Sequence, residues 1–173
     1  VYGEGDRHFL PEIVQALKDR SAPYFGGWGK NKLELAYIGN LVAAILHLLD
    51  WKDSVGQGYI LSDEEEISLR RIMDAVADGM GLERVAKNFP FPLAYLVAAL
   101  MELAYGIARN RKRPLLTRHV VTLMGRYIRY DTSKLKATGF RQPFRFEEAL
   151  SRTLAWIREM RAGSVELPTR KGA

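Results

Sequence analysis

The chain contains no cysteine among its 173 residues. Disulfide bonds and thiolate zinc sites are therefore excluded, and the absence suits a reducing compartment. Histidine is also scarce, because His8, His47 and His119 are scattered and no spacing places two of them on one helix face. We therefore expect no metal site built on histidine.

Motifs for nucleotides and nucleic acids are missing as well. The sequence holds neither G-x-G-x-x-G nor G-x-x-G-x-x-G. The glycine-rich loop at 26–31 is not a P-loop, because the GxxxxGK[ST] spacing fails and Asn31 stands where a hydroxyl is required. Zinc-finger spacing, an RNP-like run and a helix-turn-helix pattern are also absent, so we expect no nucleic-acid partner.

The composition is that of a globular chain. An apolar fraction of 47% with 10% aromatic residues is enough for one domain with its own core. The 26 Lys and Arg residues against 20 Asp and Glu give a net charge of +6, and part of the excess lies in Arg109–Arg113 and in Arg170 and Lys171. This pattern predicts a solvated basic face, with contact to an anionic membrane or phosphate as the alternative.

Apolar spacing predicts a mainly helical chain with two or three short strands. Helices are expected at 9–17, 41–49, from a capping box at Ser62 and Glu65 to Met80, at 92–108, 115–123 and 133–139, and from Phe146 onward. Strands are expected at 33–38 and 59–61. Asn40 is expected to act as the N-cap of the second helix. Residues 1–161 are predicted to form one lobe and residues 162–173 a flexible tail.

The most apolar stretch runs from Phe89 to Ala108 and carries Glu102 as its only charge. From Pro92 it predicts a helix of about 17 residues, or roughly 25 Å at 1.5 Å per residue. That length falls short of a bilayer core of about 30 Å. The stretch is interpreted as a buried or lid helix, with a membrane-surface helix over 92–113 as the alternative.

Four blocks of sequence, in this order, resemble the C-terminal portion of the extended short-chain dehydrogenase/reductases. VYGEGD at 1–6 resembles that family's YGPGD turn with Glu4 in place of proline, and YIGNLVAA at 37–44 resembles its V-[DE]-N-[VL]-x-x-A segment with Gly39 in place of an acid. GQGYILSD at 56–63 resembles the last strand and turn of its Rossmann sheet. YDTSK at 130–134, with GF at 139–140, EEAL at 147–150 and Trp156, resembles its closing signature, with Thr138 in place of leucine.

Within that superfamily the chain is most similar to the branch of 3β-hydroxysteroid and sterol-4α-carboxylate 3-dehydrogenases. HFLP at 8–11, GKN at 29–31 and the proline-rich apolar helix followed by LTR at 116–118 carry this resemblance. The resemblance implies the substrate-binding lobe of an α/β Rossmann-type enzyme whose nucleotide-binding half is absent. It also implies NAD or NADP in the parent protein, with none expected on this chain alone.

The family's catalytic Tyr-x-x-x-Lys precedes the YGPGD turn, whereas the pair in this sequence, Tyr130 and Lys134, lies far beyond it. We therefore assign no catalytic residue and interpret Lys134 as structural or solvent-facing. Glu102 is interpreted as an acid reaching for solvent or as a polar contact in a pocket, and Arg118 as a surface residue or a partner for a substrate carboxylate. The residues expected to approach an apolar substrate are Tyr2, Phe9, Tyr37, Asn40, Tyr95 and Met101.

The sequence therefore leads to three hypotheses. The first is the substrate-binding portion of an NAD(P)-dependent oxidoreductase acting on a sterol-like or other bulky apolar alcohol or ketone, inactive in isolation. The second is a stand-alone helical module that binds membrane surfaces, and the third is the substrate lobe of a nucleotide-sugar epimerase or dehydratase. We also expect a cytoplasmic location, with possible membrane association. The expected partners are the missing Rossmann half and a second copy of the chain, which could pair through the unpaired strand at 59–61.

Overall fold

The structure is a computed structural model that describes residues 1–63, 66–107, 116–127 and 129–161. The chain forms two compact units. The first unit comprises Val1–Gln15, Leu35–Glu65 and the chain from Asp131 onward, and the second comprises Ala16–Glu34 and Glu66–Tyr130. The predicted tail at 162–173 lies outside the described residues, so its boundary with the lobe stays a prediction.

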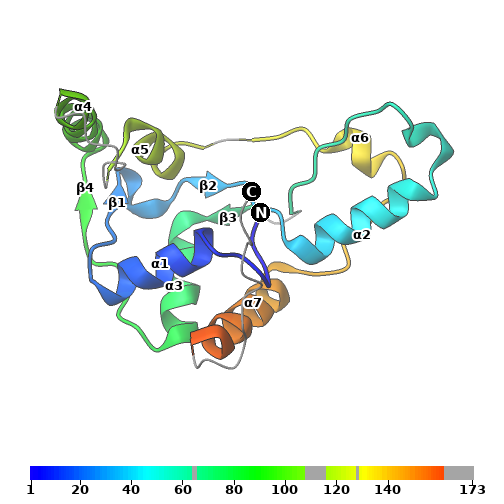
Figure 1. Ribbon diagram of the computed structural model, residues 1–173, viewed down its shortest axis with the longest axis horizontal. Helices are drawn as coiled ribbons and strands as arrows, with labels where there is room; N and C mark the ends of the chain where they lie inside the picture. Colours follow the sequence, from blue (N-terminus) through cyan, green and yellow to red (C-terminus); the bar gives the residue numbers. More distant parts are fainter. Residues whose placement is uncertain (64–65, 108–115, 128, 162–173) are drawn as a thin grey trace. The chain divides into compact units, whose positions relative to one another are not determined.

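The described residues are mainly helical, as predicted, with short strands of two residues each (Figure 1). The helices are α1 (Phe9–Lys18), α2 (Ile38–Leu49), α3 (Leu69–Met80), α4 (Phe91–Ile107), α5 (Arg118–Gly125), α6 (Ser133–Lys136) and α7 (Phe146–Arg161). The strands are β1 (Tyr24–Phe25), β2 (Lys32–Leu33), β3 (Ile67–Ser68) and β4 (Asn88–Phe89), and short 3₁₀ turns lie at Gly27–Gly29 and Lys52–Ser54.

Helix α1 begins where an acidic side chain caps it. The Asp6 carboxylate accepts hydrogen bonds of 2.9, 3.0 and 2.9 Å from the backbone N–H groups of His8, Phe9 and Leu10. The first turn of a helix leaves such donors without partners in the backbone, so this single carboxylate fixes the start of the helix. The resemblance to a YGPGD turn thus includes the acid that terminates it.

Helix α2 begins three residues earlier than predicted, and Asn40 is not its N-cap. The helix starts at Ile38, and Asn40 is buried inside its first turn, with 1% of its surface exposed. Its side chain bonds to segments distant in sequence instead of to its own helix, because tertiary partners compete successfully with local capping. The predicted strand at 33–38 is also wrong in extent, since the strand comprises only Lys32–Leu33 and a separate bridge pairs Tyr37 with Tyr2.

The predicted start of a helix at Ser62 is wrong. The Ser62 hydroxyl donates to the Leu35 carbonyl oxygen at 3.2 Å, and the following helix, α3, begins only at Leu69. Ser68 caps that helix by accepting from the Arg71 N–H at 3.2 Å, while Glu65 lies outside the described residues. The predicted end of α3 is confirmed, because Gly81 adopts the left-handed conformation with φ 65°.

Residues 59–61 form no strand, so the strand predicted there is wrong. Tyr59 and Leu61 pack instead against a cluster made by Ala44, Leu135 and Phe140. This cluster joins α2 and α6 within the first unit. Self-association through 59–61 stays a prediction.

The second unit is built around α4, α5 and β1. Strand β1 pairs with β4 in parallel, and β2 pairs with β3 antiparallel. Helices α4 and α5 lie side by side next to β1 (Figure 1), with Phe25, Ala94, Ala98 and Val121 buried between them. Because small alanines face this core, the long apolar side chains of α4 point outward.

Helix α4 has 17 residues, as the sequence predicts. Among the described helices, none is both long and apolar enough to cross a membrane. Helix α7 begins at Phe146, also as predicted, and buries Ala149, Leu150, Leu154 and Ile157 along one face. The basic residues Arg109–Arg113 that follow α4 lie outside the described residues.

Candidate functional site

Three of the predicted site residues, Tyr2, Tyr37 and Asn40, come together in the first unit. The backbone of Tyr2 bridges residues 36–38, with the Tyr2 N–H donating to Ala36 at 2.9 Å and the Ile38 N–H donating to Tyr2 at 2.8 Å. The Tyr2 and Tyr37 rings lie 5.6 Å apart between centroids, and both residues are 2% exposed. These segments therefore form a buried aromatic centre.

Asn40 joins this centre to two further segments through its side-chain amide. The amide nitrogen donates to Asp63 Oδ1 at 2.9 Å and to the Phe144 carbonyl oxygen at 3.1 Å. Its oxygen accepts from the Phe144 N–H at 3.0 Å. A buried amide with all these bonds made is a structural tie, because leaving either atom unpaired carries a desolvation cost.

Asp63 is the central acid of this cluster, and sequence reasoning missed it. Its carboxylate also accepts from the Tyr37 N–H at 3.2 Å. Burial raises the pKa of Asp63 above its usual value, and hydrogen bonds from Asn40, the Tyr37 backbone and Tyr2 oppose that rise. The signal was its place as the last residue of the GQGYILSD block.

Glu4, which replaces the family's usual proline, holds the phenol of Tyr37. The Tyr37 hydroxyl donates to the two Glu4 carboxylate oxygens at 2.7 and 3.0 Å. Burial, together with the hydrogen bond and charge of Glu4, raises the pKa of Tyr37 to about 12. A phenol with such a pKa keeps its proton at neutral pH, so Tyr37 is a hydrogen-bond donor and not a base.

Gly39, which replaces the family's usual acid, also fits this cluster sterically. A Cβ at Gly39 would stand 2.5 Å from Tyr37 Cε1 and 2.9 Å from Phe144 Cε2. The Tyr37 and Phe144 rings meet edge to face with centroids 5.3 Å apart. Any side chain at 39 would therefore displace one of the rings.

The structure divides the six predicted substrate residues between its two units. Phe9 is half-buried at the start of α1, in the unit that holds Tyr2, Tyr37 and Asn40. Tyr95 and Met101 lie on α4 in the second unit. Their grouping into one substrate pocket stays a prediction.

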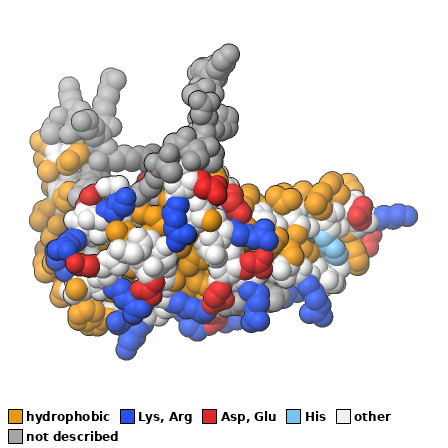
Figure 2. Space-filling model, turned by 90° about the horizontal axis from the view of Figure 1, so that it is seen from below, with side chains coloured by type: hydrophobic (Ala, Val, Ile, Leu, Met, Phe, Trp, Pro, Cys, Tyr) orange, Lys and Arg blue, Asp and Glu red, His pale blue; other side chains and the backbone are white. Residues whose placement is uncertain are grey.

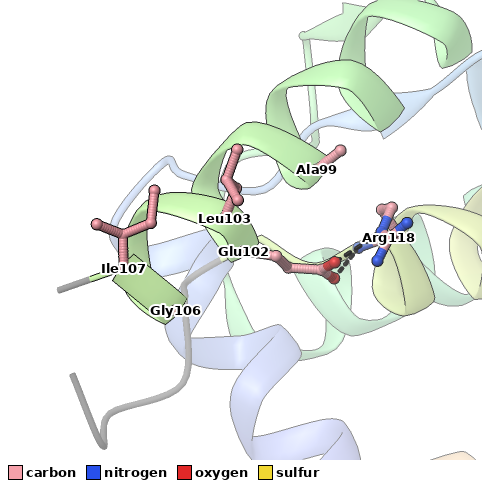
Figure 3. Close-up of a pocket in the computed structure, with 6 residues that line it drawn as sticks. All are labelled: Ala99, Glu102, Leu103, Gly106, Ile107 and Arg118. Atoms are coloured by element: carbon pink, nitrogen blue, oxygen red, sulfur yellow. Dashed lines mark hydrogen bonds and ion pairs between the residues drawn. The ribbon is translucent and has the colours of Figure 1, made fainter. Parts of the chain in front are cut away.

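A second feature is a hollow of about 550 Å³ beside the end of α4 (Figure 3). Glu102 and Arg118 face each other in its wall, and the Glu102 carboxylate accepts from the Arg118 backbone N–H at 2.8 Å and from Nε at 2.6 Å. The pKa of Glu102 lies below its usual value. The main cause is the hydrogen bond from the Arg118 backbone N–H, and the second is the hydrogen bond from the Arg118 guanidinium. Arg118 is thus already engaged by an acid of its own chain.

Lys134 has contacts that suit a structural side chain. Its Nζ donates to Gln57 Oε1 at 2.8 Å and lies 5.0 Å from the centroid of the Tyr59 ring. Such a position holds α6 against the segment at 57–59. These contacts support the interpretation that Lys134 is structural.

Basic side chains are not gathered into a stripe on the face shown in Figure 2, where Lys and Arg alternate with Asp and Glu and with apolar patches. Several form ion pairs within the second unit, such as Arg84 with Asp78 at 2.6 Å and Lys32 with Glu66.

In the described part of the chain, no group of three or more His, Cys, Asp or Glu residues has the arrangement to hold a metal ion.

The start of α1 offers no free N–H groups for a dinucleotide pyrophosphate. The glycine-containing turn at Gly3–Gly5 does precede α1, as such sites require. However, the Asp6 carboxylate already occupies the N–H groups of that helix start. The residues that precede α1 therefore do not fit the cofactor.

No family model matches the chain. Among solved structures, the UDP-glucuronic acid 4-epimerase from Bacillus cereus, solved in complex with NAD, matches 92% of this chain and 42% of its own with a TM-score of 0.59 and 12% identity. The chain thus has the fold of the C-terminal part of the Rossmann-type epimerase/dehydratase proteins.

Proteins of similar sequence indicate which class of enzyme the chain resembles. The chain is 27% identical over 175 residues to the 3β-hydroxysteroid-dehydrogenase/decarboxylase isoform 1 of Arabidopsis thaliana, an alignment that covers 94% of this chain and 39% of the relative. It is 28% identical over 124 residues to the 2-alkyl-3-oxoalkanoate reductase of Stenotrophomonas maltophilia, covering 68% of this chain and 37% of that protein. The predicted resemblance to extended short-chain dehydrogenase/reductases is confirmed, and the chain spans less than half the length of these relatives.

Proposed function

We propose that this chain is the substrate-binding portion of an NAD(P)-dependent oxidoreductase that acts on a sterol-like or other bulky apolar alcohol or ketone. The observation that carries this proposal is the alignment of 94% of the chain with a 3β-hydroxysteroid-dehydrogenase/decarboxylase. The apolar α4 supports it, because a lipophilic substrate needs apolar lining residues, whereas a sugar nucleotide requires several phosphate-binding cations.

In this proposal the chain alone is inactive. It carries no dinucleotide turn, and a pKa raised to about 12 keeps the Tyr37 phenol protonated at neutral pH, so the chain supplies neither the hydride carrier nor the base. The cofactor and the catalytic Tyr-x-x-x-Lys would belong to a Rossmann half supplied as a partner or as a longer chain.

The test is turnover with that half supplied. The chain joined to the N-terminal half of the Arabidopsis relative is assayed for NAD(P) reduction with a 3β-hydroxysteroid and, separately, for conversion of UDP-glucuronic acid. Turnover of the steroid alone supports the proposal. Conversion of the sugar nucleotide alone would transfer support to an epimerase or dehydratase lobe, whose fold the chain shares with the Bacillus cereus enzyme.

A second candidate function is binding to a membrane surface. It is favoured by the outward face of α4, where five long apolar side chains are at least half exposed: Leu93, Leu96, Leu100, Leu103 and Ile107. A face of this kind binds the boundary between headgroups and acyl chains. Flotation of the chain with anionic vesicles, weakened by salt, would support this function, and binding only in the presence of the Rossmann half would favour the first proposal.

A further inference from the structure

A second hollow in the second unit lies between the start of α4 and the end of α5. It has a volume of about 610 Å³ and is lined by Phe91, Pro92, Tyr95, Thr122 and Arg126. The lining combines an aromatic surface with one guanidinium, and Tyr95 is the only member predicted from the sequence to meet a substrate. Apolar walls with one oriented charge are the usual composition of a site for a small amphipathic molecule.

The aromatic surface is held in place by two glycines. A Cβ at Gly125 would stand 2.5 Å from Phe91 Cδ2, and one at Gly26 would stand 3.3 Å from Phe91 Cβ. Phe91 therefore fills a space that only glycines at these positions leave open. The Tyr95 ring stacks on it, with centroids 6.1 Å apart and planes at 26°. A rigid aromatic surface binds an apolar body at low entropic cost.

Arg126 supplies a guanidinium available to a ligand. It lies 5.6 Å above the centroid of the Phe91 ring, and no acid of the described residues lies within ion-pair distance of it. Its backbone N–H closes the end of α5 by donating to the Thr122 carbonyl oxygen, which leaves the guanidinium out of the helix hydrogen bonds. Arg118, at the other end of α5, is engaged by Glu102 and is not available in this way.

We propose that Arg126 binds the carboxylate of a lipophilic acid whose apolar body rests on Phe91 and Tyr95. The inference rests on the proposed function and names the substrate's charged group. It replaces the sequence-based candidate Arg118, whose guanidinium is occupied. The names of two relatives, a decarboxylase and an oxoalkanoate reductase, each refer to a carboxylate, which supports this class of ligand. Arginine suits a carboxylate because its planar fork donates two parallel hydrogen bonds.

The experiment measures binding of decanoate, below its micellar concentration, to this 173-residue chain. The probe 1-decanol has the same apolar chain without the charge, and NMR titration follows the Arg126 Nε–H signal together with the amides of α4. Arg126→Gln is expected to weaken decanoate binding about tenfold and to leave 1-decanol binding unchanged. Arg126→Lys is expected to give an intermediate loss, because it keeps the charge without the fork.

Lys87→Gln is the matched control, since it removes one exposed cation elsewhere in the same unit. A tenfold loss confined to Arg126→Gln supports the proposal. Equal binding of both probes, unchanged in Arg126→Gln, would overturn the carboxylate site while leaving an apolar substrate in place. A loss that is the same in Lys87→Gln, or no binding of decanoate, would also overturn it. The proposed function is decided separately by steroid turnover in the joined enzyme.

Discussion

At the scale of single residues, each departure from the family pattern has a local partner. Glu4 accepts the Tyr37 hydroxyl, and Gly39 makes room for the Tyr37 and Phe144 rings. Thr138, in place of leucine, contacts His47, whose Nε2 lies 3.0 Å from its hydroxyl oxygen. A change that looks like divergence in the sequence is therefore compensated in the folded chain.

The hydrogen bond between Tyr37 and Glu4 makes the first prediction at this scale. Tyr37→Phe is expected to lower the free energy of unfolding by about 1 kcal/mol, because a partly buried hydrogen bond is lost while its acceptor, the exposed Glu4 carboxylate, remains accessible to water. Urea denaturation measures the change. Glu4→Gln and the double variant complete a cycle, and a coupling energy near zero would contradict the bond. Tyr130→Phe, at a 50% exposed phenol, is the control and should have no effect.

The pKa of Asp63 makes the second prediction. Because burial raises this pKa, the folded chain holds the proton more tightly than the unfolded chain does. The contribution of Asp63 is therefore fully present below the ordinary pKa of 3.8 and is lost as pH rises through the folded pKa. Asp63→Asn does not ionise, so its stability relative to the natural chain should increase between about pH 4 and about pH 7. Urea midpoints at the two pH values test this, and a constant difference would contradict it.

At the scale of elements, the start of α2 shows where helix propensity and packing conflict. Alanine normally stabilises a helix by up to about 1 kcal/mol relative to glycine. At Gly39 the added Cβ would collide with two rings, so Gly39→Ala is expected to destabilise the chain by about 1–3 kcal/mol.

Gly106→Ala is the matched control for that variant. It lies near the end of α4, where a Cβ meets nothing within 4 Å, so it should be neutral or slightly stabilising. Thermal and urea unfolding of both variants measure the difference. Equal effects at the two sites would show that the predicted collision does not occur.

Elements with a strong local pattern were predicted well. The apolar stretch of α4 and the apolar periodicity of α7 gave these two helices correctly, and the glycine after α3 gave the end of that helix but not its start. Ser62 and Asn40 led to wrong helix starts, because serine and asparagine are common N-cap residues. In the structure both side chains form hydrogen bonds to segments distant in sequence. Short strands failed for a related reason, since residues 59–61 keep a strand-like composition but have no strand beside them.

At the scale of the whole molecule, the chain forms two compact units and spans less than half the length of its relatives. The predicted substrate residues are divided between these units. Local sequence patterns therefore do not specify which of these residues lie near one another. Arg126 was missed because it stands in no motif, and Asp63 was missed because the block that contains it does not show which side chains it meets. Asp63 matters through Asn40 and Tyr37, and Arg126 through Phe91.

The Asp6 carboxylate bonded to the start of α1 leads to a prediction about cofactor binding by the whole chain. Titration of NADH with the chain alone, followed by nicotinamide fluorescence, is expected to show no saturable binding, because Asp6 takes the helix donors that a pyrophosphate would need. The chain joined to a Rossmann half should bind NADH. Saturable binding by the chain alone would contradict the prediction.

The sequence by itself determined the class of fold and the family resemblance, because ordered motifs and apolar periodicity are local properties that a chain carries before it folds. It also determined that no cysteine or P-loop chemistry is present. Only the tertiary structure decided that the Asn40 side chain bonds to distant segments and is not a cap, that Glu4 holds Tyr37, and that Arg118 is paired with Glu102 whereas Arg126 lies over Phe91. The physical reason is that hydrogen-bond partners and desolvation depend on which distant segments meet, and spacing along the chain does not encode that meeting.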